Sequence, residues 1–411
     1  MTHEHLARLL LDAVRAQQFE NTPDAQCGGA PLRHFPSIDL AVAVFPHGAP
    51  PLWANVLFSR EHPQGVIADI GSDASAVRNV RFDADILDAA SRSVAWLPEA
   101  DWSHLAFPRL WGDGPYRFVA PYPASLFKLM VAVGVARAVD QQRCRWDETI
   151  TQAGSPCSVA LCCRDMLATS SNEAATALVA LLHRVGALGG HGDALHQTFA
   201  LYGLPTLAVT GTRADGGWDN AAGGGVGRLQ MTAWDTVRLL WLFDAAAPRA
   251  PWLAPGTPTL LSTQSAHHLR ATLEEQALHV VLSSTALSGE AGWVAGLPAR
   301  LPERWIDDDG AVHAGDWHFA PDVRPAAAAA QVRFAHKTGS SENYAADAGI
   351  VRDLGGRSGA ALRRGHYIVA LFSSLGRRHA GGGACVTTWR LPALGRTIDA
   401  ALWRLLEHKP L

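Results

Sequence analysis

The sequence contains very little lysine. Its 411 residues include 35 lysine and arginine residues, and the lysines among them are Lys128, Lys337 and Lys409. This imbalance suggests that arginine has replaced lysine wherever a positive charge alone is sufficient. A remaining lysine then indicates a place that arginine cannot fill, such as a site that needs a compact amine or one that loses its proton.

Long apolar runs and an excess of positive charge are missing as well. No stretch reaches the roughly 18 apolar residues of a transmembrane helix, so we expect no membrane span. Arg8, Asp12 and Arg15 interrupt the first apolar stretch. This predicts an amphipathic helix rather than a signal peptide, and a cytoplasmic protein, or a periplasmic one if the chain is truncated. The formal net charge of −3 lacks the basic excess typical of nucleic-acid binding, so we expect no such partner.

Patterns that mark disulfides, metals or bound nucleotides are also absent. The six cysteines have no repeated spacing, and the adjacent Cys162 and Cys163 point to different helix faces, so we expect free thiols. His191 and His196 lack further ligands, and a loop that enters a helix explains them better than a metal site. No Lys-Ser/Thr pair follows the glycine-rich stretch Gly223–Gly227. We therefore expect neither a metal nor a cofactor.

Hydrophobic periodicity predicts the order of helices and strands. A helix is expected at about residues 3–18, followed by strands at Ile38–Phe45 and Leu52–Ser59 and a helix near Ala84–Val94. Expected helices then occupy Ser125–Val139, Ser158–Ala168, Asn172–Val185, Asp193–Tyr202 and Thr232–Phe243. Three strands at 331–338, 348–353 and 366–374 and a helix at about Gly395–His408 complete the chain.

This order predicts an α/β fold, in which terminal helices flank an antiparallel sheet that is interrupted by an all-α subdomain. Residues 116–411 form the main domain. Residues 1–115 either supply the first helix and strands of the sheet together with an insertion, or form a small separate domain. The sequence predicts no oligomeric state.

Ser125 and Lys128 begin an apolar helix in the order Ser-Leu-Phe-Lys. Residues three apart lie on one helix face, so the hydroxyl and the amine can touch, and a helix N-terminus favours developing negative charge. The lysine accepts a proton only if burial or another cation lowers its pKa from about 10.4. The ordinary alternative is an N-cap serine and a surface lysine, which the apolar neighbours Leu126, Phe127 and Leu129 disfavour.

Two further motifs follow along the chain. Ser170-Ser171-Asn172 lies in a break between two helices, where a hydroxyl and an amide can face a cleft, although with Glu173 it also fits an ordinary capping box. His336-Lys337-Thr338-Gly339-Ser340 lies on an edge strand, where a lysine and hydroxyls form a ledge for a carboxylate and a backbone N–H can donate to an oxyanion. Its ordinary alternative is an exposed lysine that blocks edge-to-edge pairing.

Together the three motifs are far more specific than each one alone. The order S-x-x-K, S-x-N, K-T-G, each in its expected helix, loop or strand, resembles the class A β-lactamase and penicillin-binding-protein superfamily over about residues 116–411. Two of the three lysines fall inside these motifs. The resemblance implies a β-lactamase/transpeptidase-like fold and a serine hydrolase whose small-molecule substrate carries a carboxylate.

The resemblance also implies a role for each motif residue. Ser125 would be the acylated nucleophile and Lys128 its general base. Ser170 would pass a proton to the leaving group, and Asn172 would hold Lys128 and contact the substrate amide. Lys337 would help to lower the pKa of Lys128, and the N–H groups of Ser125 and Ser340 would form the oxyanion hole. The implied substrate-binding residues are Lys337, Thr338, Gly339 and Ser340.

The sequence departs from the family pattern at three points. The middle motif is Ser-Ser-Asn instead of Ser-Asp-Asn, for which we expect little mechanistic loss. The long gap before the third motif implies an insertion at about residues 265–330 that could cover or reshape the cleft. The glutamate that activates the deacylating water in class A β-lactamases has no clear counterpart. Asp215, two residues after Arg213, is a candidate for this catalytic role, but a turn aspartate in a glycine-rich loop is the stronger interpretation.

The sequence therefore predicts a serine hydrolase that forms an acyl-enzyme on a β-lactam or on a related amide or ester. The missing glutamate shifts the expected activity from an efficient β-lactamase toward an esterase, amidase or peptidase. The alternatives are a D-alanyl-D-alanine peptidase-like acyltransferase or penicillin-binding protein and, less favoured, a non-catalytic scaffold.

Overall fold

A six-stranded antiparallel sheet organises the structure, a computed structural model that describes residues 2–88, 93–97, 99–189, 193–219, 228–319, 321–355, 365–380 and 386–407. The strand order is β15-β16-β17-β3-β4-β5. Its strands are β3 (Ile38–Phe45), β4 (Leu52–Phe58), β5 (Val66–Ile67), β15 (Val332–Ser340), β16 (Ala345–Asp353) and β17 (His366–Ser373). The three C-terminal strands and the three N-terminal strands therefore lie next to each other in one sheet, joined where β17 pairs with β3.

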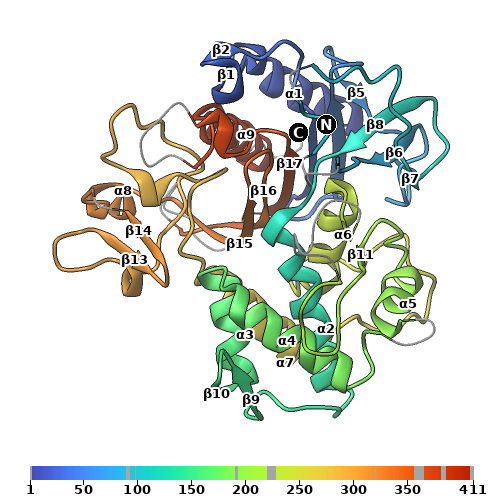
Figure 1. Ribbon diagram of the computed structural model, residues 1–411, viewed down its shortest axis with the longest axis vertical. Helices are drawn as coiled ribbons and strands as arrows, with labels where there is room; N and C mark the ends of the chain where they lie inside the picture. The colour runs from blue at the N-terminus through green and yellow to red at the C-terminus, as the bar shows by residue number, and fades with distance from the viewer. Residues whose placement is uncertain are drawn as a thin grey trace.

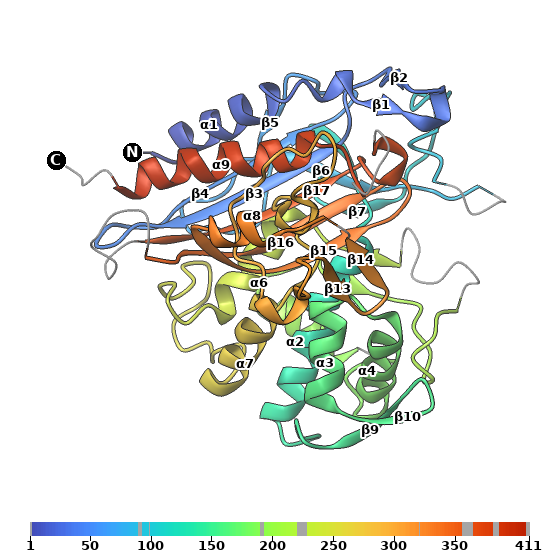
Figure 2. The same ribbon diagram turned by 90° about the vertical axis from the view of Figure 1, so that its left-hand side faces the viewer.

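The two terminal helices cover one face of this sheet. Helices α1 (His3–Arg15) and α9 (Arg390–Glu407) run side by side over it (Figure 2). Leu6, Leu10 and Val14 recur every four residues and form a buried stripe on α1. The opposite face of the sheet packs against the helical part of the chain, so both faces are covered. This burial explains why β3 is a nearly continuous apolar run.

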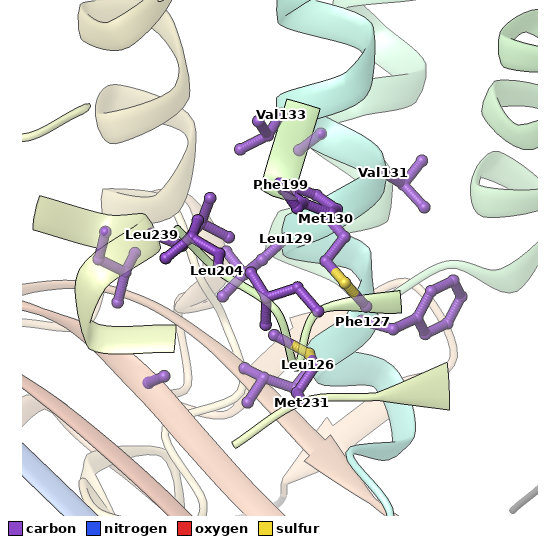
Figure 3. Packing of buried hydrophobic residues seen from close by; sticks show 14 of the residues in the cluster. Leu126, Phe127, Leu129, Met130, Val131, Val133, Phe199, Leu204, Met231 and Leu239 are labelled. Atoms are coloured by element: carbon purple, nitrogen blue, oxygen red, sulfur yellow. The ribbon is translucent and has the colours of Figure 1, made fainter. Parts of the chain in front are cut away.

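The helical part lies between the N-terminal and C-terminal strands of the chain. It contains α2 (Lys128–Asp140), α3 (Val159–Ala168), α4 (Asn172–Arg184), α5 (Ala194–Leu201), α6 (Ala233–Phe243) and α7 (Thr263–Glu274) (Figure 1). Leu126, Leu129 and Met231 pack together around the start of α2 (Figure 3). The predicted α/β fold, with an antiparallel sheet, flanking terminal helices and an inserted helical part, is confirmed.

The described residues between 68 and 120 form a small sheet and loops beside the main sheet. Strands β6 (Val80–Ala84), β7 (Arg109–Trp111) and β8 (Tyr116–Ala120) are ordered β7-β6-β8. The helix expected near 84–94 is wrong for the described residues of that stretch, which are strand and loop. The buried Asp85 carboxylate accepts hydrogen bonds from the backbone N–H groups of Ile86 and Ala95, and these contacts hold the chain in a non-helical path.

The insertion before β15 reaches the second motif. It contains the hairpin of β13 (Val312–Ala314) and β14 (Trp317–Phe319), followed by α8 (Arg324–Ala328). A Cβ at Gly315, in the hairpin turn, would lie 3.4 Å from the Cβ of Thr169. The hairpin therefore borders the loop that carries Ser170. Helix α7, at the start of the expected insertion, belongs instead to the helical part, where it packs against α2 and α3.

The remaining strands are short. They are β1 (Pro23–Asp24), β2 (Ala30–Pro31), β9 (Thr149–Gln152), β10 (Ser155–Ser158), β11 (Ala208–Val209) and β12 (Leu229–Gln230), and they pair as β1-β2, β9-β10 and β11-β12. Every helix in the described ranges is too short or too polar to cross a membrane.

Candidate active site

Ser125 lies in a short 3-10 turn, Ala124–Phe127, that leads directly into α2. Ala124 has a φ of 47°, so the backbone bends sharply just before the serine. Gly339 on β15 faces this turn. A Cβ there would overlap the carbonyl oxygen of Pro123 and would lie 3.0 Å from the nitrogen of Ser125. The missing side chain thus lets the strand approach the turn and brings Ser340 close to Ser125.

Lys128 is completely buried at the first position of α2. Its Nζ donates to the carbonyl oxygen of Ser170 at 2.5 Å, to Asn172 Oδ1 at 2.8 Å and to Ser170 Oγ at 3.3 Å. Within the described residues, none of its hydrogen bonds goes to Ser125 Oγ. Burial lowers the pKa of Lys128 to about 7, against a weaker opposing effect of the Glu173 charge. A large fraction of this amine is therefore neutral near pH 7, as a general base requires.

Lys337 lies on the edge strand β15 and is also completely buried. Its Nζ donates to Ser170 Oγ at 2.9 Å and to the carbonyl oxygen of Thr338 at 2.7 Å. Burial lowers the pKa of Lys337, and the charge of Lys128 lowers it further. The alternative of an exposed lysine that protects a sheet edge is therefore wrong. For Lys128 itself, burial rather than the charge of Lys337 is the main cause of the lowered pKa.

Ser170 joins α3 to α4 in a left-handed conformation, with a φ of 63°. Few residues other than glycine adopt this conformation. The backbone N–H groups of Thr169 and Ser171 donate to the carbonyl oxygen of Asp165 at 3.3 and 3.2 Å and close the turn. In this position the Ser170 hydroxyl faces both lysines. The strained backbone of Ser170 thus lies at the point that both lysine amines contact.

Ser171, and not Ser170, caps α4. Its Oγ accepts from the N–H of Ala174 at 3.1 Å and lies 3.0 Å from Glu173 Oε2. The capping box that the sequence places on Ser170 is therefore wrong, because the cap is the next serine. Ser171 stabilises the helix N-terminus, which leaves the Ser170 hydroxyl to the lysines.

The predicted carboxylate-binding residues follow one another at the end of β15. Thr338 is 4% exposed and pairs with Asp347 on β16, whereas Ser340 is half-buried and pairs with Ala345. Ser340 is thus the most open residue of this group. The structure brings Ser125, Lys128, Ser170, Asn172, Lys337 and Gly339 together through the contacts above, with Ser340 next to them along the strand.

Asp215 lies apart from this group on an exposed turn. Its carboxylate accepts from Arg213 Nη2 at 3.0 Å and from the N–H of Gly217 at 2.8 Å. The Arg213 guanidinium and this N–H lower the pKa of Asp215. In the part of the chain that the structure describes, its carboxylate makes no contact with Ser125 or Lys128. The geometry is that of a turn aspartate. The catalytic role of Asp215 stays a prediction.

An aromatic group beside Ser125 was not predicted. The ring of Tyr122, three residues before Ser125, lies 5.7 Å from the ring of Tyr344 at the start of β16. Trp96 Nε1 donates to the Tyr344 hydroxyl at 2.8 Å, and that hydroxyl donates to Asp85 Oδ2 at 2.8 Å. These residues come from three distant parts of the sequence, so no local sequence pattern predicts that they lie together.

The remaining candidates lie elsewhere. His196 Nε2 accepts from the N–H of Val209 at 2.9 Å, which is a structural contact, and His191 and Gly223–Gly227 lie outside the described residues. The described ranges hold no cluster of three or more histidine, cysteine, aspartate or glutamate side chains suited to a metal ion. Cys162 and Cys163 are free thiols.

Comparison with known proteins finds solved structures that are similar to this chain. No protein-family profile and no curated protein matches the chain. The structure of PBP-A is 17% identical over 70% of this chain and 82% of its own, with a TM-score of 0.41. A β-lactamase from Sphaerobacter thermophilus DSM 20745 is 12% identical over 98% of both chains, with a TM-score of 0.46. A β-lactamase from Streptosporangium roseum is 14% identical over 69% and 84%, with a TM-score of 0.40. At such identities the activity of this chain has to be argued from its own site.

Proposed function

We propose that this chain is a serine hydrolase that forms an acyl-enzyme on Ser125. One observation carries the proposal: two buried lysines from separate elements donate to the same hydroxyl, Ser170 Oγ, beside the turn that holds Ser125. Burying an amine is costly. A buried pair of amines around one serine therefore favours a catalytic purpose over a structural one.

In the proposed reaction, neutral Lys128 accepts the proton of Ser125 as Oγ attacks the carbonyl carbon of the substrate. A C–O bond forms, and the electron pair of the C=O bond moves to the oxygen, which accepts hydrogen bonds from the N–H groups of Ser125 and Ser340. When this pair returns, the bond to the leaving nitrogen or oxygen breaks. The leaving atom takes a proton from Ser170 Oγ, and Lys128 returns its proton to Ser170.

The substrate class follows from the end of β15. Lys337, Thr338 and Ser340 offer an amine and two hydroxyls beside the nucleophile turn, which suits a carboxylate. A substrate carboxylate beside Lys337 would favour its charged form and so offset the effect of burial. We therefore propose a β-lactam, or a related amide or ester that carries a carboxylate, as the substrate.

The position of Asp215 favours a second candidate, a penicillin-binding protein or D-alanyl-D-alanine peptidase-like acyltransferase. Hydrolysis of the acyl-enzyme needs a base for water. The exposed Asp215 is held by Arg213 and Gly217, and within the described ranges no carboxylate accepts a hydrogen bond from Lys128. Acylation that is faster than deacylation is the expected result.

A substrate panel tests the proposal. Nitrocefin, p-nitrophenyl esters and D-Ala-D-Ala peptides would be compared on the wild type, on Ser125→Ala and on the control Ser103→Ala, which changes an exposed loop serine. We expect turnover or burst kinetics that Ser125→Ala abolishes and Ser103→Ala retains. Turnover that survives in Ser125→Ala would contradict the mechanism. A panel with no turnover and no covalent labelling would support the scaffold alternative instead.

A further inference from the structure

A second hollow opens at the end of the main sheet, outside the group around Ser125. It is partly enclosed by protein and partly open to solvent. We call it the arginine pocket, and it is defined by Arg33, His34, Phe35, Arg60, Trp96 and Arg378. These residues come from the loop before β3, the end of β4, the segment 93–97 and the chain after β17.

The arginine pocket lies at the same end of the sheet as Ser340. Ser340 pairs with Ala345, Ala345 with Ser373, and Ser373 with Ile38. Ser374, directly after this row, lines the pocket. Because neighbouring strands lie about 4.8 Å apart, two strand spacings, or about 10 Å, separate Ser340 from the β17 end of the pocket.

One wall is shared between the pocket and the aromatic group beside Ser125. Trp96 lines the pocket and donates through Nε1 to the hydroxyl of Tyr344. Arg378, on the same wall, donates through Nη1 to the carbonyl oxygen of Trp96 at 2.8 Å. Trp96 thus connects the arginine pocket to the aromatic group beside Ser125.

The charges around the pocket are mainly positive. Among the described residues that line it, the one carboxylate, Asp24, is already paired with the buried Arg378, whose Nε lies 3.1 Å from Asp24 Oδ1. Arg60 donates through Nη1 to the carbonyl oxygen of Ala100 at 2.9 Å, and its guanidinium lies 5.1 Å from the ring of Trp102. Among the described residues, no carboxylate lies within ion-pair distance of Arg60.

The acidic residues near Arg60 act from further away. Asp101 and Glu61 raise the pKa of Arg60 against the larger, opposite effect of burial, and Glu61 is itself paired with Arg117. Burial and the charges of Arg60 and Arg33 lower the pKa of His34. A partly buried guanidinium that has no carboxylate partner gains more binding free energy from an anion than a guanidinium in open water does.

The rest of the lining is apolar and aromatic. Leu32, Phe35, Trp96 and Leu97 line the hollow. An inorganic anion would leave these surfaces unused. A ligand with one anionic group and a flat apolar body uses both the charge and the rings.

We propose that the arginine pocket binds an organic anion, in which a carboxylate, sulfonate or phosphate is attached to an aromatic or similarly flat apolar group. The ligand is either a separate small molecule or the remote end of a substrate that occupies the cleft. Both sources share this chemistry.

Calorimetric titration with naphthoate and its neutral analogue naphthamide tests the pocket. The Ser125→Ala chain is used, so that binding does not depend on the proposed hydrolase activity. We expect naphthamide to bind about tenfold more weakly than naphthoate, and Arg60→Gln to weaken naphthoate binding about tenfold. Arg143→Gln is the matched control, because Arg143 also donates to a backbone carbonyl but lies away from the pocket. Equal binding of the two compounds, or no effect of Arg60→Gln, would overturn the proposal.

Cysteine alkylation locates the bound naphthoate. Cys27 lines the pocket and is half-buried, and Cys157 on β10 is a half-buried control in the same chain. We expect naphthoate to slow iodoacetamide alkylation of Cys27 and to leave Cys157 unchanged. Naphthoate held only by Lys337 and Ser340 in the cleft would leave both rates unchanged, and that result would contradict the pocket.

Competition on the wild type separates the two sources of ligand. If the pocket takes the remote end of a substrate, naphthoate should slow acylation by an activated ester competitively, and Arg60→Gln should relieve this inhibition. If the pocket takes a separate molecule, chains with and without an acyl group on Ser125 should bind naphthoate with equal affinity. Either result supports the pocket.

Discussion

Lys128 and Lys337 donate to one oxygen atom, the Ser170 hydroxyl, from 3.3 and 2.9 Å. One lysine begins a helix of the helical part, and the other lies on the edge strand of the main sheet. The two parts of the fold thus meet at this hydroxyl. Two of the three lysines in the chain are therefore buried amines of lowered pKa beside one hydroxyl, as the proposed mechanism requires.

The acylation rate should depend on the protonation of Lys128. Its pKa is about 7, and only the neutral amine accepts a proton. The rate of acylation by an activated ester should therefore rise with pH, reach half its maximum near pH 7, and fall about tenfold for each pH unit below that. Stopped-flow measurement between pH 5 and pH 9 checks this. A rate that is flat across this range would remove Lys128 as the base.

Lys128→Arg should abolish most of the acylation. A guanidinium does not lose its proton in proteins, so the rate should fall by about 10²- to 10⁴-fold, the usual contribution of a general base. Lys409→Arg, at a position outside the described residues, is the control and should keep the wild-type rate. Equal tolerance of both substitutions would contradict the assignment.

Two substitutions of Ser170 should lose activity alike but differ in stability. Ser170→Ala and Ser170→Gly both remove the shared hydroxyl, so both should lose acylation by about 10²-fold or more. The left-handed backbone at this position suits glycine, so Ser170→Gly should be more stable than Ser170→Ala by about 1 kcal/mol. Denaturant unfolding measures this difference. Equal stabilities would mean that the backbone strain is released in the variants, and full activity in either would exclude the proton relay.

Gly339→Ala should disrupt the site through the backbone. Its Cβ would overlap the carbonyl oxygen of Pro123 and crowd the nitrogen of Ser125, so β15 and the nucleophile turn must separate. We expect acylation to fall by at least about 10²-fold, with near-wild-type circular dichroism. Gly48→Ala is the control: Gly48 has a φ of 73° but open space around it, so the substitution should cost stability and keep activity. Wild-type acylation in Gly339→Ala would contradict the close approach of strand and turn.

Asp215→Asn should leave deacylation unchanged. The Asp215 carboxylate is exposed and is occupied by Arg213 and Gly217, so we expect the acyl-enzyme of the variant to decay at the wild-type rate. Decay is followed by mass spectrometry after the excess substrate has been removed. A decay at least tenfold slower in the variant would instead identify Asp215 as the base for deacylation.

Much of the fold followed from local patterns. The boundaries of β3 match the predicted Ile38–Phe45, and α4 begins at Asn172 as expected, because apolar periodicity and helix caps are properties of neighbouring residues. The helix expected near residues 84–94 failed, since the path there depends on hydrogen bonds of Asp85 to residues distant in sequence. Helix α9 begins at Arg390, five residues before the expected start.

The site was predictable in its motifs and in the contact of Asn172 with Lys128, but not in its other contacts. The spacing of Ser125 and Lys128 suggested a direct contact, whereas the hydrogen bonds of Lys128 go to Ser170 and Asn172. Ser171 caps α4 while the Ser170 hydroxyl accepts from both lysines. This division depends on the left-handed conformation of Ser170, which sequence alone does not specify. The arginine pocket combines residues from four segments, and only the folded sheet brings them together.

Intact-mass spectrometry after incubation with a penicillin or an activated ester is the most direct measurement of acylation on Ser125. We expect one covalent adduct per chain, located by peptide mapping on the peptide that contains Ser125 and absent from Ser125→Ala. An adduct that persists in Ser125→Ala, or that maps to another residue, would contradict the assignment of Ser125 as the nucleophile.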